Sequence, residues 1–155
     1  MIIEVPGYQT LDIRKLLLDY NGTIAVDGLI RESVKERLKG LSEQFEIFIL
    51  TADTHGTARK ECEGLGVKVH TFPVGDAMDH KLRILEEEAS LHCVCIGNGR
   101  NDRKMFEKAA LSIGVIDKEG AYMKTLNAAD LCVTSSEDAL DLLRYPKRLI
   151  AGLRG

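Results

Sequence analysis

Short apolar runs alternate with stretches of helical spacing along almost the whole chain. Within residues 31–44, for example, Val34, Leu38 and Leu41 recur at the spacing that places side chains on one face of a helix. The apolar runs predict strands over residues 16–19, 46–50, 67–72, 93–96, 111–116 and 131–134. Because parallel neighbours need helical crossovers, this alternation predicts an α/β fold with a three-layer, doubly wound, mostly parallel sheet. No linker or repeat interrupts it, so we expect one domain over residues 1–155.

Two short hairpins are predicted outside the alternating pattern. The first pairs residues 2–5 with residues 10–14 and leads into the main sheet. The second covers residues 24–30, with its turn at Asp27-Gly28.

The end of the chain and the lengths of the connections complete the expected architecture. Ser136 is expected to cap the last helix, and Pro146 to begin a C-terminal turn. The connections after the first central strand and after the third are too short to hold a cap domain. We therefore expect the carboxyl edge of the sheet to be open.

Charge and aromatic content exclude several classes of partner. The formal net charge is −3 and the isoelectric point is about 5.8, so no basic surface for nucleic acid is indicated. Trp is absent, and four Tyr and four Phe offer little for stacking on bases. No apolar run reaches the roughly 18 residues that a membrane span requires, and the N-terminus does not resemble a leader. We expect neither a nucleic-acid nor a membrane partner.

The four cysteines indicate core packing in a reducing compartment. Cys93 and Cys95 lie in a predicted buried strand, and Cys62 and Cys132 are isolated in the sequence. This spacing matches no zinc framework, and free cysteines are common in cores. A cytoplasmic location is the expectation that follows.

Polar residues gather where the predicted strands stop. They are Asp19 and Asn21 after the first central strand, Thr51 and Asp53 after the second, Lys81 after the third, and Asn98, Asn101 and Asp102 after the fourth. Because the carboxyl ends of parallel strands share one edge of a sheet, these side chains are expected to lie together. Taken one at a time, each is equally well a turn residue, a helix cap or a surface side chain.

The order of these residues resembles the haloacid dehalogenase (HAD) superfamily of aspartate-nucleophile phosphotransferases, and in particular the phosphorylation domain of P-type ATPases. That domain's Asp-Lys-Thr-Gly-Thr motif is similar to Asp19-Tyr-Asn-Gly-Thr23, and its Thr-Gly-Asp motif to Thr51-Ala52-Asp53. The family's lysine is matched best by Lys81, although Lys60, Lys68 and Lys104 are alternatives. The last motif, Gly-Asp-Gly-x-Asn-Asp, is similar to residues 97–102. The resemblance implies a Rossmann-like HAD fold without a cap.

The resemblance also implies a role for each residue. Asp19 would be the nucleophile that forms an aspartyl phosphate, with Asn21, Thr51 and Lys81 as the other catalytic positions. Gly22, Thr51, Ala52 and Lys81 would bind the phosphoryl group. The expected cofactor is Mg²⁺, with Asp19, Asn21 (through its backbone carbonyl), Asn98 and Asp102 as the metal-binding positions. Asn101 and Asp102 would also hold Lys81, and the substrate would be an unidentified phosphorylated compound.

Two residues depart from the family pattern. Family phosphatases carry a second Asp where this chain has Asn21, and an amide cannot exchange a proton near neutral pH. Asn98 stands where the family has a metal-binding Asp, which removes one negative charge from the expected site. We therefore expect weak hydrolysis of esters with poor leaving groups.

Several alternatives stay open at this point. The two asparagines are equally compatible with a catalytically impaired binding or regulatory module, and the P-type resemblance with a stand-alone ATP-hydrolysing domain. Arg100 and Arg103 could meet an anionic substrate or a partner protein, and the sequence does not choose between them. An open site in a capless protein also makes a homo-oligomer plausible.

Overall fold

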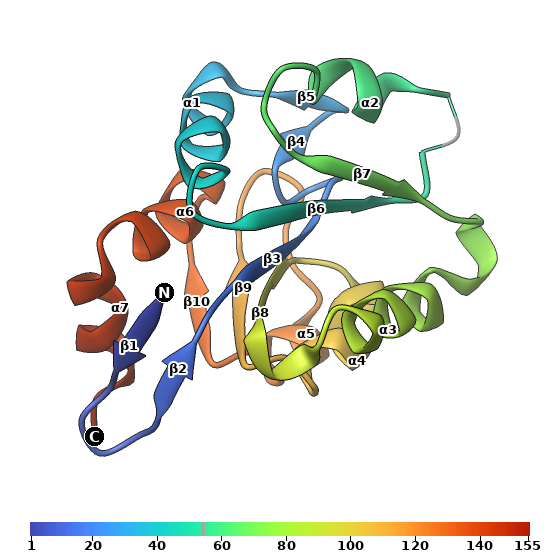
Figure 1. Ribbon diagram of the computed structural model, residues 1–155. Helices are drawn as coiled ribbons and strands as arrows, with labels where there is room; N and C mark the ends of the chain where they lie inside the picture. The colour runs from blue at the N-terminus through green and yellow to red at the C-terminus, as the bar shows by residue number, and fades with distance from the viewer. Residues whose placement is uncertain (54) are drawn as a thin grey trace.

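Six parallel strands form the central sheet in the order β10-β9-β8-β3-β6-β7 (Figure 1). The computed structural model describes residues 1–53 and 55–155. The strands are β3 (Lys15–Asp19), β6 (Glu46–Thr51), β7 (Lys68–Thr71), β8 (Cys93–Gly97), β9 (Leu111–Val115) and β10 (Leu131–Val133). Every neighbouring pair is parallel. This confirms the predicted doubly wound α/β fold.

Helices cover both faces of this sheet. One face carries α1 (Glu32–Leu41), α2 (Thr57–Glu61), α6 (Ser136–Arg144) and α7 (Pro146–Leu153). The other carries α3 (Ala77–Glu87), α4 (Arg103–Phe106) and α5 (Met123–Leu126). Single 3₁₀ turns lie at Val74–Asp76, Ser90–His92 and Arg100–Asp102.

The alternation of side chains along β3 explains the three layers. Leu16 and Leu18 point into the core cluster that contains Val34 of α1. Leu17, between them, points into the opposite cluster, which contains Leu85 of α3. Successive residues of a strand face opposite sides, so a strand that is apolar throughout must be covered on both faces.

Both predicted hairpins are present. β1 (Ile2–Glu4) and β2 (Thr10–Asp12) pair antiparallel in a small sheet of their own, which is separate from the main sheet. β4 (Ala25–Val26) and β5 (Leu29–Ile30) pair around Asp27 and Gly28, whose φ angles are 52° and 78°. Two successive positive φ angles are typical of the tight turn that matches the twist of a hairpin.

The end of the chain differs from the prediction in two details. Ser135, not Ser136, caps α6, because the Ser135 side chain accepts a hydrogen bond from the Asp138 amide at 3.0 Å. Ser136 is buried and donates its hydroxyl to the backbone carbonyl of Thr23. The expected turn after Pro146 is an eight-residue helix, α7, with the proline in its first turn. Across the described ranges, none of the helices combines the length and the hydropathy needed to cross a bilayer.

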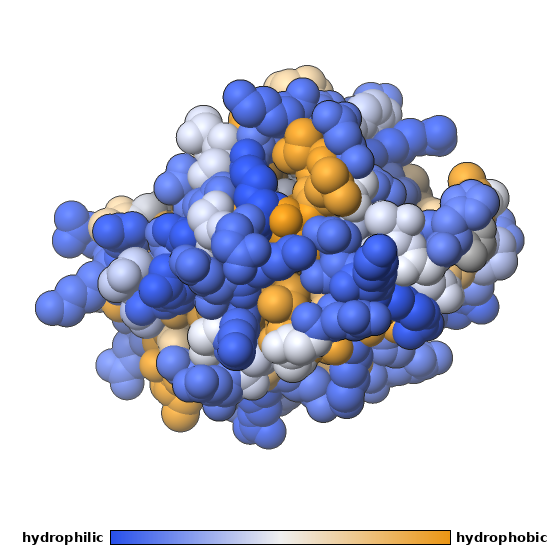
Figure 2. All heavy atoms as spheres, turned by 90° about the horizontal axis from the view of Figure 1, so that it is seen from above, coloured by the Kyte–Doolittle hydropathy of each residue, from blue (hydrophilic) through white to orange (hydrophobic). Residues whose placement is uncertain are grey.

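The strand order places a topological switch point at β3. From β3 the chain goes to β6 and β7 on one side, and then returns to β8 on the other. A crevice opens at the carboxyl ends of strands where the order reverses in this way, and ligands bind there in open α/β sheets. Seen from above Figure 1, the surface is mainly hydrophilic, with hydrophobic atoms in a narrow central band (Figure 2).

Candidate active site

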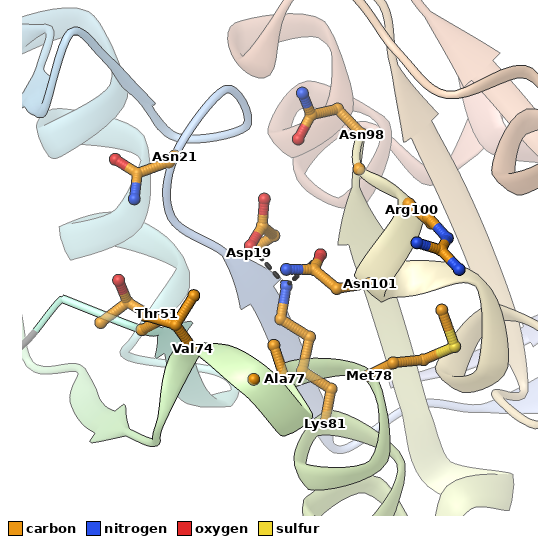
Figure 3. A pocket seen from close by; sticks show the side chains of 13 residues that line it. Asp19, Asn21, Thr51, Val74, Ala77, Met78, Lys81, Asn98, Arg100 and Asn101 are labelled. Atoms are coloured by element: carbon orange, nitrogen blue, oxygen red, sulfur yellow. Dashed lines mark hydrogen bonds and ion pairs between the residues drawn. The ribbon is translucent and has the colours of Figure 1, made fainter.

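A pocket of about 470 Å³ lies at the carboxyl edge of the sheet (Figure 3). Eight residues named from the sequence are among those that line it: Asp19, Asn21, Thr51, Ala52, Lys81, Asn98, Arg100 and Asn101. Gly22 and Asp102 do not line it. The structure therefore brings together side chains that the sequence separates by up to 82 positions, from Asp19 to Asn101.

The Asp19 carboxylate is held by a cation on one oxygen and by a hydroxyl on the other. Its side chain is largely buried, Lys81 Nζ donates to Oδ1 at 2.5 Å, and Thr23 Oγ1 donates to Oδ2 at 3.2 Å. Burial, followed by the charge of Asp102, raises the pKa of Asp19 to about 6, while Lys81 and Thr23 act in the opposite direction. Near pH 7.5 the metal-free carboxylate is ionised and able to act as a nucleophile.

Lys81 is a fully buried lysine whose three ammonium hydrogens all have acceptors. Besides Asp19, Nζ donates to Asn101 Oδ1 at 3.0 Å and to Asp102 Oδ1 at 2.6 Å. Burial alone would lower the pKa of Lys81, but the carboxylates of Asp102 and Asp19 outweigh it and raise that pKa. The lysine thus brings a permanent positive charge to the base of the pocket.

The other candidate lysines lie elsewhere. Lys68 pairs with Glu46 and Lys104 pairs with Asp79, both on the surface. A signal in the sequence could have singled out Lys81, because it lies at helical spacing between Ala77 and Leu85 on the buried face of α3. A lysine on the apolar stripe of a helix must find partners in the interior.

Asp102 supports the site from behind. Its side chain is fully buried, and its Oδ2 accepts from the amides of Asn98 at 3.0 Å and Gly99 at 2.8 Å, while Oδ1 accepts from Lys81. A Cβ at Gly97 would lie 2.4 Å from Oδ2, so this position requires glycine. Both oxygens of Asp102 are used in shaping the loop and holding the lysine.

Asn98 is oriented by two hydrogen bonds. Its Oδ1 lies 3.1 Å from Thr23 Oγ1, whose single hydroxyl hydrogen it shares with Asp19 Oδ2, and its Nδ2 donates to the Gly120 carbonyl at 2.9 Å. Thr23 therefore joins Asn98 to Asp19, a role that the sequence analysis did not assign, although the residue closes the first motif. Gly22, with φ of 77°, permits this approach, since a Cβ there would lie 2.4 Å from Asn98 Nδ2.

The Gly22 amide is hydrogen-bonded within the turn that contains it. It donates to the Ala25 carbonyl at 2.9 Å. In this structure Gly22 acts through its small size and its backbone angle, and the expected contact of this residue with phosphate stays a prediction.

The opposite wall of the pocket carries Asn21 and Thr51. Asn21 is exposed and also lines a neighbouring pocket. Thr51 is buried, and its Oγ1 accepts from the Asp53 amide at 3.1 Å, which leaves its hydroxyl hydrogen available to a ligand. Asp53 accepts from the amides of Ala58 and His55, and these bonds lower its pKa.

The oxygen atoms of the pocket suit a hard cation, although only weakly. The Asp19 carboxylate and the Asn98 amide oxygen are linked through Thr23, and Asn21 lines the same pocket. Oxygen ligands of this kind are those that Mg²⁺ prefers. Among residues 1–53 and 55–155, no group of three or more His, Cys, Asp or Glu side chains is arranged to hold a metal ion. A cation here would therefore rely on one carboxylate and on neutral oxygens.

Two proteins of Methanocaldococcus jannaschii are similar to this chain in sequence. The uncharacterized protein MJ0073 is 40% identical over 92 residues, which are 57% of this chain and 99% of that protein. The uncharacterized protein MJ0072 is 67% identical over 39 residues, which are 25% of this chain and 89% of that protein. No family model matches the sequence.

Solved structures of phosphatases share the fold. The 3-deoxy-D-manno-octulosonate 8-phosphate phosphatase of Moraxella catarrhalis, in complex with magnesium, phosphate and KDO, superposes with a TM-score of 0.73 at 15% identity, covering 92% of this chain and 94% of that one. The cobalt-bound deoxy-D-mannose-octulosonate 8-phosphate phosphatase of Haemophilus influenzae gives 0.69 at 16% identity, with 92% and 90% covered.

A third structure gives the same result. A putative HAD superfamily (subfamily III A) hydrolase of Legionella pneumophila has a TM-score of 0.71 at 17% identity, covering 90% of this chain and 87% of that one. The chain belongs to the same family as MJ0073 of Methanocaldococcus jannaschii, and its fold is that of the HAD phosphatases.

Proposed function

We propose that this protein is a Mg²⁺-dependent phosphohydrolase or phosphotransferase that works through an aspartyl phosphate at Asp19. The observation that carries the proposal is the Asp19 carboxylate itself, which lines an open pocket while a buried lysine holds one of its oxygens at 2.5 Å. The Moraxella catarrhalis phosphatase, which shares the fold and is in complex with magnesium, phosphate and KDO, supports the same chemistry and the same cofactor.

In the proposed first step, a carboxylate oxygen of Asp19 attacks phosphorus in line with the ester oxygen. The new bond joins Asp19 to phosphorus, and the leaving group departs with the electrons of the broken P–O bond. Lys81 offsets negative charge beside the nucleophile, and the Thr51 hydroxyl donates to a phosphoryl oxygen. In the second step water attacks phosphorus, the bond between Asp19 and phosphorus breaks, and the protons of the water leave with the phosphate, which restores the Asp19 carboxylate.

The residues that would hold Mg²⁺ are the Asp19 carboxylate, the side-chain oxygen of Asn98 and the backbone carbonyl of Asn21. A bound Mg²⁺ would supply positive charge that reduces the repulsion between a carboxylate and a phosphoryl group. Asp102, which we expected among the metal positions, has both oxygens engaged and would act through Lys81 and the loop amides. One carboxylate in place of two makes weak Mg²⁺ binding the expectation.

The leaving group receives no acid from this chain. Asn21 occupies the position of the family's proton donor, and an amide does not supply a proton near neutral pH. The nearby Asp53 is a poor substitute, because its lowered pKa keeps it ionised. We propose that acyl phosphates and aryl phosphates, whose leaving groups need little protonation, are the reactive substrates.

Intact-protein mass spectrometry after incubation with acetyl phosphate and Mg²⁺ tests this function. The expected result is one added phosphate on the wild type and none on Asp19→Asn. ATP in place of acetyl phosphate tests the alternative of stand-alone ATP hydrolysis. No adduct from either donor, with Mg²⁺ binding verified by calorimetry, would overturn the proposal and favour a binding module.

A further inference from the structure

A second pocket of about 390 Å³ adjoins the active-site pocket. Met78 and Arg100 line both, so the two hollows share a wall. Figure 3 shows Arg100 and Met78 on the opposite side of Asp19 from Asn21 and Thr51. The two pockets are therefore adjacent, with Met78 and Arg100 between them.

The second pocket contains more positive charge than its own carboxylates neutralise. Arg103 pairs with Glu107 at 2.9 Å, and Lys104 pairs with Asp79 at 2.5 Å. Lys124 and Arg100 also line the pocket, and neither makes an ion pair within the part of the chain that the structure describes. Two cations without partners in one hollow favour an anionic occupant.

Hydrogen bonds hold this pocket at a set position relative to Asp19. The Thr125 hydroxyl is fully buried and donates to the Gly99 carbonyl at 2.9 Å. The Tyr122 amide donates to the Asn98 carbonyl at 2.8 Å. Lys124 lies between these two anchors, and Arg100 follows Gly99 directly. Both cations are thus carried by segments bonded to the loop that forms the active site.

We propose that Arg100 and Lys124 form an anion subsite, which binds a second anionic group on the substrate. The substrate class is then an acyl or aryl phosphate that also carries a carboxylate or a further phosphate. This inference rests on the proposed function, because it assigns the reacting phosphate to the pocket at Asp19. Arg100 offers a planar fork suited to either anion, and Lys124 adds a point charge.

Equilibrium binding of phosphonates tests the subsite without any turnover. Calorimetry would compare alkylphosphonates with ω-carboxyalkylphosphonates and alkyl bisphosphonates of equal chain length, from two to five methylenes, in the presence of Mg²⁺. The proteins are wild type, Arg100→Ala, Lys124→Ala, and Lys39→Ala as a matched control that removes one exposed positive charge on α1.

The second anion is expected to tighten binding to wild type by about tenfold at the best chain length. That gain should shrink to about twofold or less in Arg100→Ala and Lys124→Ala and remain in Lys39→Ala, which should also bind plain alkylphosphonates as tightly as the wild type does. The series that binds more tightly, carboxylate or bisphosphonate, identifies the second anionic group of the substrate. Equal affinities for all three series, no binding of any compound, or a full gain in both subsite variants would overturn the inference. Failure to form an acyl phosphate would instead count against the function alone.

Discussion

The two sides of the active-site pocket differ in the burial and hydrogen bonding of their polar side chains. On the lysine side, Lys81 and Asp102 are both 1% exposed or less, and each polar atom has a partner. On the asparagine side, Asn21 is exposed, and its side chain makes no hydrogen bond to the described residues. In the proposed mechanism, the buried lysine neutralises charge before any ligand arrives, whereas position 21 offers no proton to the leaving group.

The largest expected effect is on the rate of hydrolysis and comes from placing a carboxyl group at position 21. Asn21→Asp places a titratable carboxyl where the chain has an amide, and general acid–base catalysis is worth about 10²–10⁴-fold. We expect hydrolysis of alkyl phosphates to rise within that range, measured as phosphate release. Asn127→Asp, the same change at an exposed position on the end of α5, should have no effect.

An unchanged rate in Asn21→Asp would contradict the inferred difference between the two sides of the pocket. Ordinary phosphatase rates of the wild type on alkyl phosphates would do so equally. In either case the missing acid at position 21 would not be what limits the reaction.

Removing the buried cation should cost the most stability. Lys81→Met leaves Asp19 and Asp102 facing each other without a counter-charge, and breaking a buried ion pair costs about 3–5 kcal/mol. Urea unfolding at pH 7.5 measures this loss. The control is Lys68→Met, which breaks the surface pair with Glu46 and should cost less than about 1 kcal/mol. Similar losses in the two variants would mean that the lysine side is no better organised than the surface.

A milder change on the lysine side removes one charge and keeps the shape. Asp102→Asn retains a single acceptor oxygen, so either Lys81 or the loop amides of Asn98 and Gly99 lose theirs. An unsatisfied buried polar group costs about 1–3 kcal/mol. We expect a loss of that size in urea unfolding, together with less aspartyl phosphate after acetyl phosphate treatment. Asp138→Asn, on the exposed side of α6, is the matched control, and an equal result for both would remove the supporting role of Asp102.

The smallest effect is expected at Asp53, which lines the neighbouring pocket together with Asn21. Its two carboxylate oxygens accept from the His55 and Ala58 amides, and Asp53→Asn keeps only one acceptor oxygen, so it should cost about 1 kcal/mol, as the loss of one hydrogen bond does. The folded pKa of Asp53 is lowered, so its contribution is complete above the ordinary pKa near 4 and is lost as pH falls through the lower folded value. Urea unfolding at pH 7 and pH 3 should show the wild-type advantage shrinking in acid. A difference independent of pH would exclude the ionised carboxylate as its cause.

Much of the site could be placed from the sequence because parallel strands end at one edge. That rule alone brings Asp19, Thr51 and Asn98 into one pocket, and the structure bears it out. Among the lysines, Lys81 was preferred for its place after the third strand, and its helical spacing with Ala77 and Leu85 supports the same choice. The sequence analysis missed the shift of the α6 cap from Ser136 to Ser135, which depends on one residue's backbone angles.

The sequence by itself therefore determined the order of strands and helices, the doubly wound sheet and the edge at which the polar residues gather, because these depend on local periodicity. Only the tertiary structure decided that Lys81 is buried against Asp19, that Asp102 faces the loop, and that Arg100 and Lys124 share a pocket. Those facts depend on packing between segments far apart in the chain, which spacing along the sequence does not specify.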